Sequence, residues 1–327
     1  MKKTLLSLFA LIHVLSTSAQ INLTYQTPPA SIQELLDAPT TPTAHFSKSR
    51  NKLLLLQPPD CPSIEVVSQP ILGLAGLRIN PLNNASAVAV TYTKMSLQEV
   101  KSTDDQTFEG LPTDARIGNI TWSPDEKYIA FSNTTKEGVE LWFADTERLT
   151  AKKLSNRYLN DAYGNTLQWA PNGAYILAQF IVDKRGARPS EDAVPAGPIV
   201  QENLGKKAPS RTYQNLLKNP YDEKLMDFFL TSQLYNVDLD GKEVAIAGPA
   251  IYREVSFSPD GKYLMVQKIQ KPYSYLVPIY SFPFQTSIYN VKGKEVKSLH
   301  LSPLAENLPT GFDAVVKGPR GYSWRAD

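Results

Sequence analysis

Serine, histidine and acidic residues could together form a hydrolytic site, but their spacing in this sequence does not favour one. Hydrolysis by an activated serine requires a base and an orienting acid within hydrogen-bond reach of the nucleophile. The chain has three histidines: His13 in an apolar leader, His45 in a proline-rich stretch and His300 between two leucines. Gly-x-Ser-x-Gly, which exposes a nucleophilic serine on a sharp turn, does not occur in the 327 residues. We therefore predict no catalytic residue in this chain and interpret His45 and His300 as structural or surface residues.

Metal and cofactor chemistry have as little support in the sequence. Cys61 is the only cysteine, and no His-x-x-x-His or Cys-x-x-Cys pair occurs, so we expect neither a zinc site nor an internal disulfide. The paired acids Asp104-Asp105 and Asp222-Glu223 stand in hydrophilic contexts, where we expect them to keep loops solvated. A phosphate-cradling glycine loop is absent as well. We predict no cofactor-binding and no metal-binding residue.

The net charge bears on the class of partner, and the first residues bear on the cellular location of the protein. A formal net charge of +2 with scattered basic residues argues against a nucleic-acid partner. Lys2 and Lys3 precede a short apolar run, and small residues up to Ala19 resemble a cleavage site, so residues 1–19 are a predicted signal peptide. The run is too short to cross a bilayer, and we expect no membrane span. An exported protein without a disulfide fits the periplasm or the extracellular space.

A ten-residue pattern recurs along the chain. It begins at Trp122 (WSPDEKYIAF), at Trp169 (WAPNGAYILA) and at Phe257 (FSPDGKYLMV). The intervals between these starts are 47 and 88 residues, and the second is about twice the first. Trp324-Arg-Ala-Asp begins a fourth copy at the end of the sequence, which we interpret as an unfinished hairpin.

Each copy of the pattern has the chemistry of a strand, a tight turn and a second strand. Proline fixes φ at the first turn position, Asp or Asn hydrogen-bonds the turn backbone, and in the second and third copies glycine supplies a residue that readily adopts a positive φ. The next residues alternate between two faces, with Leu264 and Val266 opposite Tyr263 and Met265. A hairpin every forty-odd residues is typical of four-stranded propeller blades. The sequence predicts an all-β fold, an incomplete β-propeller of about four to five WD40/TolB-like blades; a β-sandwich with unrelated hairpins is the alternative.

The doubled interval predicts an insertion in the ring. Residues 183–229 are rich in proline, glycine and charge, with apolar residues on both sides of Pro220. This composition indicates a loop followed by a short helical segment that Pro220 interrupts. Asp240-Gly241 then has the signature of a hairpin turn, at which the strand pattern resumes.

The stretch before the repeats has a different character. Residues 20–60 are extended and proline-rich, with a short helix expected at residues 31–36. Ser31 is the expected N-cap of this helix and Glu34 its capping-box partner, because they are three residues apart. We expect residues 61–327 to form the partial propeller, truncated before a further domain.

Several segments between the repeats resemble the N-terminal half of exported serine peptidases of the prolyl oligopeptidase family, in the glutamyl endopeptidase-like branch. The segments that carry the resemblance are YQTPP (25–29), IQELLDAPTTP (32–42), LAGLRINP (74–81), QENLGK (201–206), RTYQNLL (211–217) and GPRGYSWRAD (318–327). They are more distinctive than the propeller turns and extend across nearly the whole mature chain.

The resemblance implies a larger, two-domain enzyme. A propeller would cover an α/β-hydrolase domain with a Ser-Asp-His triad, admit peptides and exclude folded proteins, and the enzyme would cleave after acidic residues. This chain lacks the hydrolase domain, so it would be inactive alone, and an open ring should self-associate. An acid-selecting site would use basic side chains, and six arginines are available: Arg78, Arg116, Arg157, Arg185, Arg188 and Arg211. A stand-alone binding module in the periplasm or on the cell surface, and a non-functional fragment, are the alternatives.

Overall fold

The computed structural model describes residues 26–164, 166–191, 212–308 and 314–325 of the chain. Contacts divide the chain into two compact units, residues 1–40 and residues 41–327. The described part of the first unit contains one helix, α2 (Ala30–Leu36). The predicted signal peptide, residues 1–19, lies outside the described residues.

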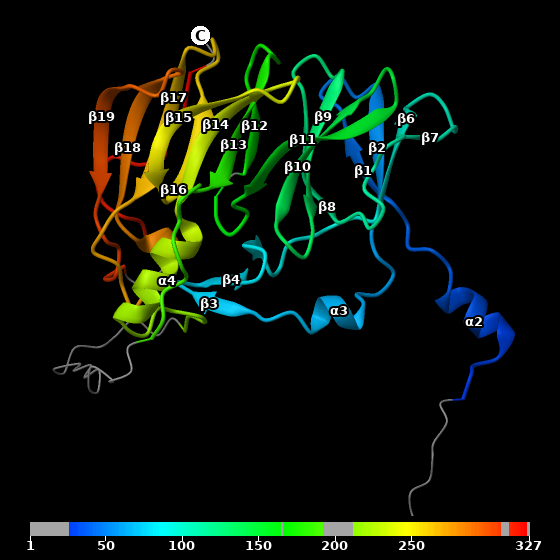
Figure 1. Cartoon of the computed structure of the whole chain (residues 1–327), viewed down its shortest axis with the longest axis horizontal. Coiled ribbons are helices and arrows are strands. Elements are labelled where there is room, and N and C mark those ends of the chain that lie inside the picture. The colour runs from blue at the N-terminus through cyan, green and yellow to red at the C-terminus, as the bar shows by residue number, and fades with distance from the viewer. Residues whose placement is uncertain (1–25, 165, 192–211, 309–313, 326–327) are drawn as a thin grey trace, which may run out of the picture. The chain divides into compact units, whose positions relative to one another are not determined.

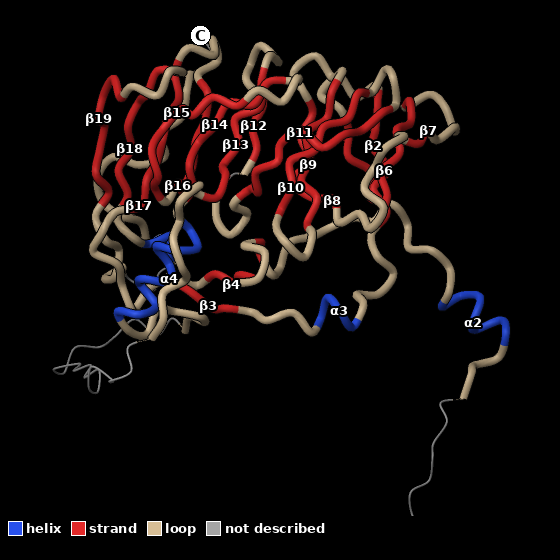
Figure 2. Tube along the Cα trace, viewed as in Figure 1, coloured by secondary structure: helices blue, strands red, loops and turns tan. Residues whose placement is uncertain are grey.

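The second unit is built from antiparallel four-stranded blades, which Figures 1 and 2 show as a row of strands with few helical segments. Each blade has its strands in chain order. Blade 1 contains β1 (Thr43–Phe46), β2 (Lys52–Gln57), β6 (Lys94–Glu99) and β7 (Gln106–Thr107). Blade 2 contains β8 (Ile117–Trp122), β9 (Tyr128–Thr134), β10 (Val139–Asp145) and β11 (Thr150–Leu159). Blade 3 contains β12 (Leu167–Trp169), β13 (Tyr175–Ile181), β14 (Ser232–Asp238) and β15 (Glu243–Ala250), and blade 4 contains β16 (Tyr252–Phe257), β17 (Tyr263–Ile269), β18 (Phe284–Asn290) and β19 (Glu295–Ser302).

This arrangement confirms the predicted all-β propeller fold with a helical insertion. Blades 2 and 3 are continuous as one sheet through the single pair Leu159–Phe180. The three predicted hairpins connect β8 to β9, β12 to β13 and β16 to β17, which are the first and second strands of their blades. The predicted turn at Asp240-Gly241 connects β14 to β15.

Apolar side chains from neighbouring blades form a separate core at each junction. The second strand of a blade serves two of these cores, because its side chains alternate between faces. Ile129 and Phe131 of β9 face blade 1, whereas Ala130 faces blade 3. In β13, Ile176 and Ala178 belong to the core with blade 2. No blade buries both of its faces alone, so the blades stabilise one another by stacking.

The long connections between second and third strands pack together as a fourth core. Blade 1 contributes α3 (Ile64–Val67), β3 (Leu72–Leu74), β4 (Leu77–Asn80) and β5 (Ala85–Ser86), blade 3 contributes α4 (Pro220–Leu230), and blade 4 contributes the short helix η1 (Ile279–Ser281). Figure 1 shows β3, β4 and α4 grouped at one end of the blades. Leu74, Phe229 and Phe282, one from each connection, are buried together.

The helix α4 begins at Pro220, a residue at which the sequence analysis expected an interruption. Proline is well placed at the first helical position, where its missing N–H has no intrahelical partner. Asn219 is the N-cap, and its Oδ1 accepts a hydrogen bond of 2.9 Å from the N–H of Asp222. Asp222 and Glu223 therefore lie in the first turn of a helix and not in the expected loop.

The segment before the repeats also differs from its prediction. The N-cap of α2 is Pro29, no side chain caps the helix, and Ser31 already lies in its first turn, so the predicted Ser31–Glu34 capping box is wrong. Strands β1 and β2 come before residue 61 and pair with β6 in blade 1. The blades therefore begin earlier than the sequence analysis expected.

Candidate functional site

The hairpin turns between the first and second strands of the four blades share one geometry, although the sequence analysis found this pattern in only three of them. In blade 1, Phe46-Ser47-Lys48-Ser49-Arg50 aligns with Phe257-Ser258-Pro259-Asp260-Gly261. The N–H of Ser47 donates to the carbonyl of Lys52 at 2.9 Å, as the N–H of Ser258 donates to Tyr263 at 2.9 Å. Arg50 adopts a φ of +58°, close to the +68° of Gly261. Blade 1 therefore carries a fourth copy of the pattern, without its proline and glycine.

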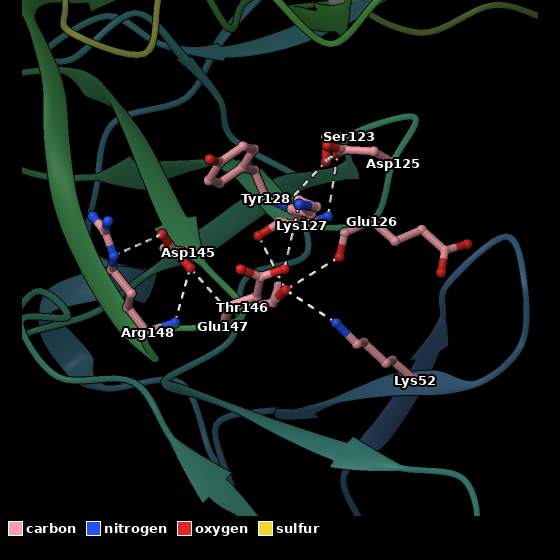
Figure 3. A network of polar contacts seen from close by, with 10 residues as sticks. All are labelled: Lys52, Ser123, Asp125, Glu126, Lys127, Tyr128, Asp145, Thr146, Glu147 and Arg148. Atoms are coloured by element: carbon pink, nitrogen blue, oxygen red, sulfur yellow. Dashed lines mark hydrogen bonds and ion pairs between the residues drawn. The ribbon is translucent and has the colours of Figure 1, made fainter.

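Side chains of the turn in blade 2 form the polar network of Figure 3. Ser123 Oγ donates to Asp125 Oδ1 at 2.6 Å and accepts from the N–H of Tyr128 at 3.0 Å. Thr146 Oγ1 lies within donating distance of the carbonyls of Glu126 (3.1 Å) and Lys127 (3.0 Å), and it accepts from Nζ of Lys52 in blade 1 at 3.3 Å. Every group in this network fixes a turn or joins two blades, so its chemistry is structural.

The aromatic residue of the pattern connects successive blades. Trp169 Nε1 donates to the carbonyl of Thr121, the residue before Trp122, at 3.1 Å. Trp324 Nε1 donates at 3.3 Å to the carbonyl of Ser256, which holds the same position before Phe257. The described residues around Trp324 form no strand, so the expected fourth hairpin start is present only as this contact with blade 4.

The histidines have ordinary structural surroundings. His45 Nδ1 accepts a hydrogen bond of 3.1 Å from Trp122 Nε1, and burial lowers the pKa of its imidazole. His300 lies in the edge strand β19, with its ring 6.4 Å from that of Tyr322. In the described part of the chain neither imidazole hydrogen-bonds a serine. Cys61 is exposed, and the described residues contain no group of three or more metal-ligating side chains.

Two of the arginines in the predicted insertion lie against α4. Arg185 Nη1 donates to Asn84 Oδ1 at 2.6 Å, and its guanidinium lies 4.0 Å from the Phe228 ring. Burial lowers the pKa of Arg185. Arg188 lies 5.4 Å from the ring of Phe229. These contacts place Arg185 between Asn84 of the blade 1 connection and the aromatic rings of α4.

The remaining arginines are separated from one another. Arg157 forms ion pairs with Glu243 and Asp183. Arg78 is exposed and hydrogen-bonds Gln214 at 3.1 Å. Arg116 is half-buried immediately before β8, and Arg211 lies outside the described residues. The structure therefore assembles no basic cluster from the arginines that it describes.

A cavity of about 350 Å³ lies where the connection of blade 1 meets the first and second strands of blade 2. Asp161 is its charged residue, and two side chains donate to Asp161 Oδ1: Asn119 Nδ2 at 2.8 Å and Thr166 Oγ1 at 2.7 Å. Burial raises the pKa of Asp161, against the effect of these two hydrogen bonds. The sequence analysis missed this site, because its lining comes from segments that are far apart in the chain.

The described helices include none with the length and apolar character of a membrane span.

Comparison with known proteins identifies relatives over nearly the whole chain. No family model matches. The chain is 36% identical over 319 residues to a probable chloroplastic glutamyl endopeptidase of Oryza sativa subsp. japonica, and 34% identical over 316 residues to one of Arabidopsis thaliana. Each alignment covers 93% of this chain but 34% and 33% of the respective relative. The chain thus spans about a third of the length of the curated relatives it matches.

Solved structures give weaker matches. An acylaminoacyl peptidase of Pyrococcus horikoshii aligns with a TM-score of 0.40 and 13% identity, over 81% of this chain and 33% of that one. A putative TolB of Agrobacterium tumefaciens aligns with a TM-score of 0.35 and 12% identity, over 83% and 84% of the two chains. The assignment of the blades rests on their own strand pairing and not on these scores.

Proposed function

Since this chain is a propeller part of the prolyl oligopeptidase family, in the branch of the glutamyl endopeptidases, we propose that it is the non-catalytic propeller of an exported serine peptidase. The observation that carries the proposal is the 36% identity across 93% of the chain. The alignment covers 34% of that relative, which leaves room in the relative for a separate catalytic domain.

The propeller is proposed to control access to an α/β-hydrolase domain that this sequence does not include. Blades that are fixed to one another by buried cores form a rigid wall, and such a wall would admit an extended peptide more readily than a folded protein. The hydrolase domain would supply the serine, the acid and the base, and the enzyme would cleave after glutamate or aspartate. The histidine contacts described above support a non-catalytic role for the present chain.

Activity measurements on matched proteins test this function. The chain alone should not cleave an internally quenched peptide that contains one glutamate. A protein extended by the sequence encoded after residue 327 should cleave it and should leave a folded protein of similar composition intact. Replacing the serine of a Gly-x-Ser-x-Gly elbow in that extension should abolish cleavage.

Two results would overturn the proposal. One is turnover by the present chain that is lost only when one of its own serines is replaced. The other is a downstream reading frame that encodes no hydrolase domain, which would favour a stand-alone binding module. A gating role predicts in addition that the extended protein without residues 41–327 cleaves folded proteins.

Export is part of the same proposal. The basic and apolar residues at 1–19 support a cleaved signal peptide. Protein recovered from the periplasm or the medium should begin at Gln20, as N-terminal sequencing will establish. Recovery from the cytoplasm with Met1 retained would contradict export without affecting the proposed peptidase function.

A further inference from the structure

The cavity around Asp161 has the composition of a binding site and not of a packing defect. The residues that line it include the hydroxyl-bearing Ser86, Ser132 and Tyr163 and the apolar Leu77 and Val90. An unfilled packing defect is lined by apolar atoms, whereas small-molecule sites combine an apolar wall with a few placed polar groups. A volume of about 350 Å³ falls at the lower end of the range of such sites.

A β-bulge in β8 supplies one wall of this cavity. The register between β8 and β9 shifts between Gly118 and Thr121, and Asn119, in the bulge, adopts a φ of +47°. Positive φ is uncommon for residues other than glycine, and such bulges often lie beside functional sites. The Asn119 amide donates to Asp161 Oδ1 at 2.8 Å and to Ser132 Oγ at 3.1 Å. The bulge therefore fixes the orientation of the carboxylate.

The charge of Asp161 is not balanced by a neighbouring cation. Its two recorded side-chain donors, Asn119 and Thr166, are neutral and share Oδ1. Among the described residues, no lysine or arginine forms an ion pair with Asp161, and no donor contacts Oδ2. A half-buried carboxylate without a counter-charge is stabilised when a cationic ligand arrives.

We propose that this cavity binds a primary ammonium group on an alkyl stem, with Asp161 Oδ2 accepting from the ammonium and the apolar wall contacting the stem. The hydroxyl of Ser132 and the other polar groups of the wall provide further acceptors. Burial raises the pKa of Asp161 because it disfavours the charged carboxylate, and a bound cation would stabilise that charge. The site is independent of the proposed peptidase function, since a peptide-binding module could use it equally.

Two sources of this chemistry are a lysine side chain and the amino terminus of a peptide. Three probes distinguish them: acetyl-Gly-Lys-Gly-amide, Gly-norleucine-Gly-amide with a free amino terminus, and acetyl-Gly-norleucine-Gly-amide, which has no ammonium group. Titration calorimetry on the full chain should detect binding of the first or the second probe and none of the third. Equal binding of all three, or of none, would overturn the proposal.

Asp161→Asn is the decisive variant, because the amide oxygen can still accept from Asn119 and Thr166 while the charge is removed. Affinity for the ammonium probe should fall about tenfold or more, as for loss of a charge-assisted hydrogen bond. Asp260→Asn is the matched control: Asp260 accepts from Ser258 Oγ at 2.6 Å and from the N–H of Lys262 at 3.1 Å in a distant turn. This control should leave the affinity within about twofold. Unchanged binding by Asp161→Asn would show that Asp161 only stabilises its loop.

A second variant keeps the test decisive if Asp161→Asn does not fold. A Cβ at Gly118 would lie 3.3 Å from Ser132 Oγ and 3.6 Å from the carbonyl oxygen of Val90, so Gly118→Ala narrows the cavity without changing its charge. We expect this variant to fold and to bind the ammonium probe at least about fivefold more weakly, since part of the volume is filled. Unaltered affinity would place the ligand outside this cavity.

Discussion

The junction between blades 2 and 3 and the junction between blades 3 and 4 use the same position of the repeat, but with different side chains. Trp169 packs on Tyr128, with ring centroids 6.5 Å apart, and Phe257 packs on Tyr175 at 6.0 Å. Trp169 also donates a hydrogen bond to the carbonyl of Thr121. Phe257 has no N–H with which to reach Gln168, the corresponding residue. Aromatic packing is therefore common to both junctions, and the hydrogen bond is an addition at one of them.

The two junctions also differ in whether backbone pairing joins the sheets of the neighbouring blades. Blades 2 and 3 share the pair Leu159–Phe180, whereas blade 4 forms a separate sheet. The contact of Trp324 with Ser256 shows that an indole-to-carbonyl hydrogen bond also reaches blade 4. The comparison teaches that stacked blades do not depend on an indole donor at this position. Trp169 bonds a backbone carbonyl of the preceding blade, Trp122 bonds the side chain of His45, and at the junction of blades 3 and 4 the hydroxyl of Tyr252 bonds the carbonyl of Gly248 instead.

Removing the indole altogether should have the largest effect. Trp169 is 6% exposed and lies in the core between blades 2 and 3, so Trp169→Ala should lower the free energy of unfolding by about 3–5 kcal/mol. Phe257→Ala should cost about 1 kcal/mol less, because no hydrogen bond is lost with the ring. Urea unfolding followed by circular dichroism measures both. A greater loss of unfolding free energy in Phe257→Ala than in Trp169→Ala would show that the hydrogen bond of Trp169 does not make its junction the more stable one.

A methyl group placed between blades 3 and 4 should have the next largest effect. Gly293 has a φ of +85°, and a Cβ there would fall on the carbonyl oxygen of Ile246 in blade 3. Gly293→Ala should therefore cost about 3 kcal/mol or more, through backbone strain and a direct clash. Gly261→Ala is the control: its φ is +68°, but the nearest atom, Pro171 Cδ, is 3.5 Å from the new Cβ.

The control isolates the contribution of the junction. Both glycines adopt a left-handed conformation, so Gly261→Ala should cost about 1 kcal/mol for the backbone alone. Equal losses in thermal unfolding would mean that blade 4 can move away from Ile246 without a penalty, and that the junction is looser than its packing indicates.

The smaller change Trp169→Phe converts one junction into a copy of the other. It keeps the aromatic ring against Tyr128 but removes the hydrogen bond to Thr121, and it should cost about 1 kcal/mol. The urea concentration at the midpoint of unfolding should fall, while the slope of the unfolding free energy against urea concentration stays constant. A loss above about 3 kcal/mol would show that the larger indole fills space that phenylalanine leaves empty.

The sequence predicts the repeat hairpins because their chemistry is local. Pro259, Asp260 and Gly261 specify a turn without help from the rest of the fold. Blade 1 has the same turn without proline or glycine, and Arg50 adopts the positive φ. Stacking against blade 2 supports this conformation, since Ser49 hydrogen-bonds Glu126 in the neighbouring turn. A signal was present in Phe46 and the serine that follows it, but it is too weak to be distinguished from chance.

The connections and the cavity could not be predicted in the same way. The fourth core contains residues as far apart as Leu74, Phe229 and Phe282, and their association depends on the order in which the blades stack. Asp161 has no motif around it, and its site forms because the bulge at Asn119 and the connection of blade 1 meet in space. The helix α2 was predicted with the wrong cap because Pro29, with its extended backbone, lets the helix begin one residue before Ser31.

The smallest effect is expected from installing the missing donor, Phe257→Trp. If the indole adopts the orientation of Trp169, Nε1 reaches the carbonyl of Gln168 and stability should rise by at most about 1 kcal/mol. Because Phe257 is 7% exposed, the extra ring must displace neighbours, and a loss of stability would show that Tyr175 leaves no space for it. The double variant Trp169→Phe/Phe257→Trp moves the hydrogen bond from one junction to the other and should leave the unfolding free energy close to that of the wild type. A strongly destabilised double variant would mean that the two junctions differ in shape and not only in the presence of a donor.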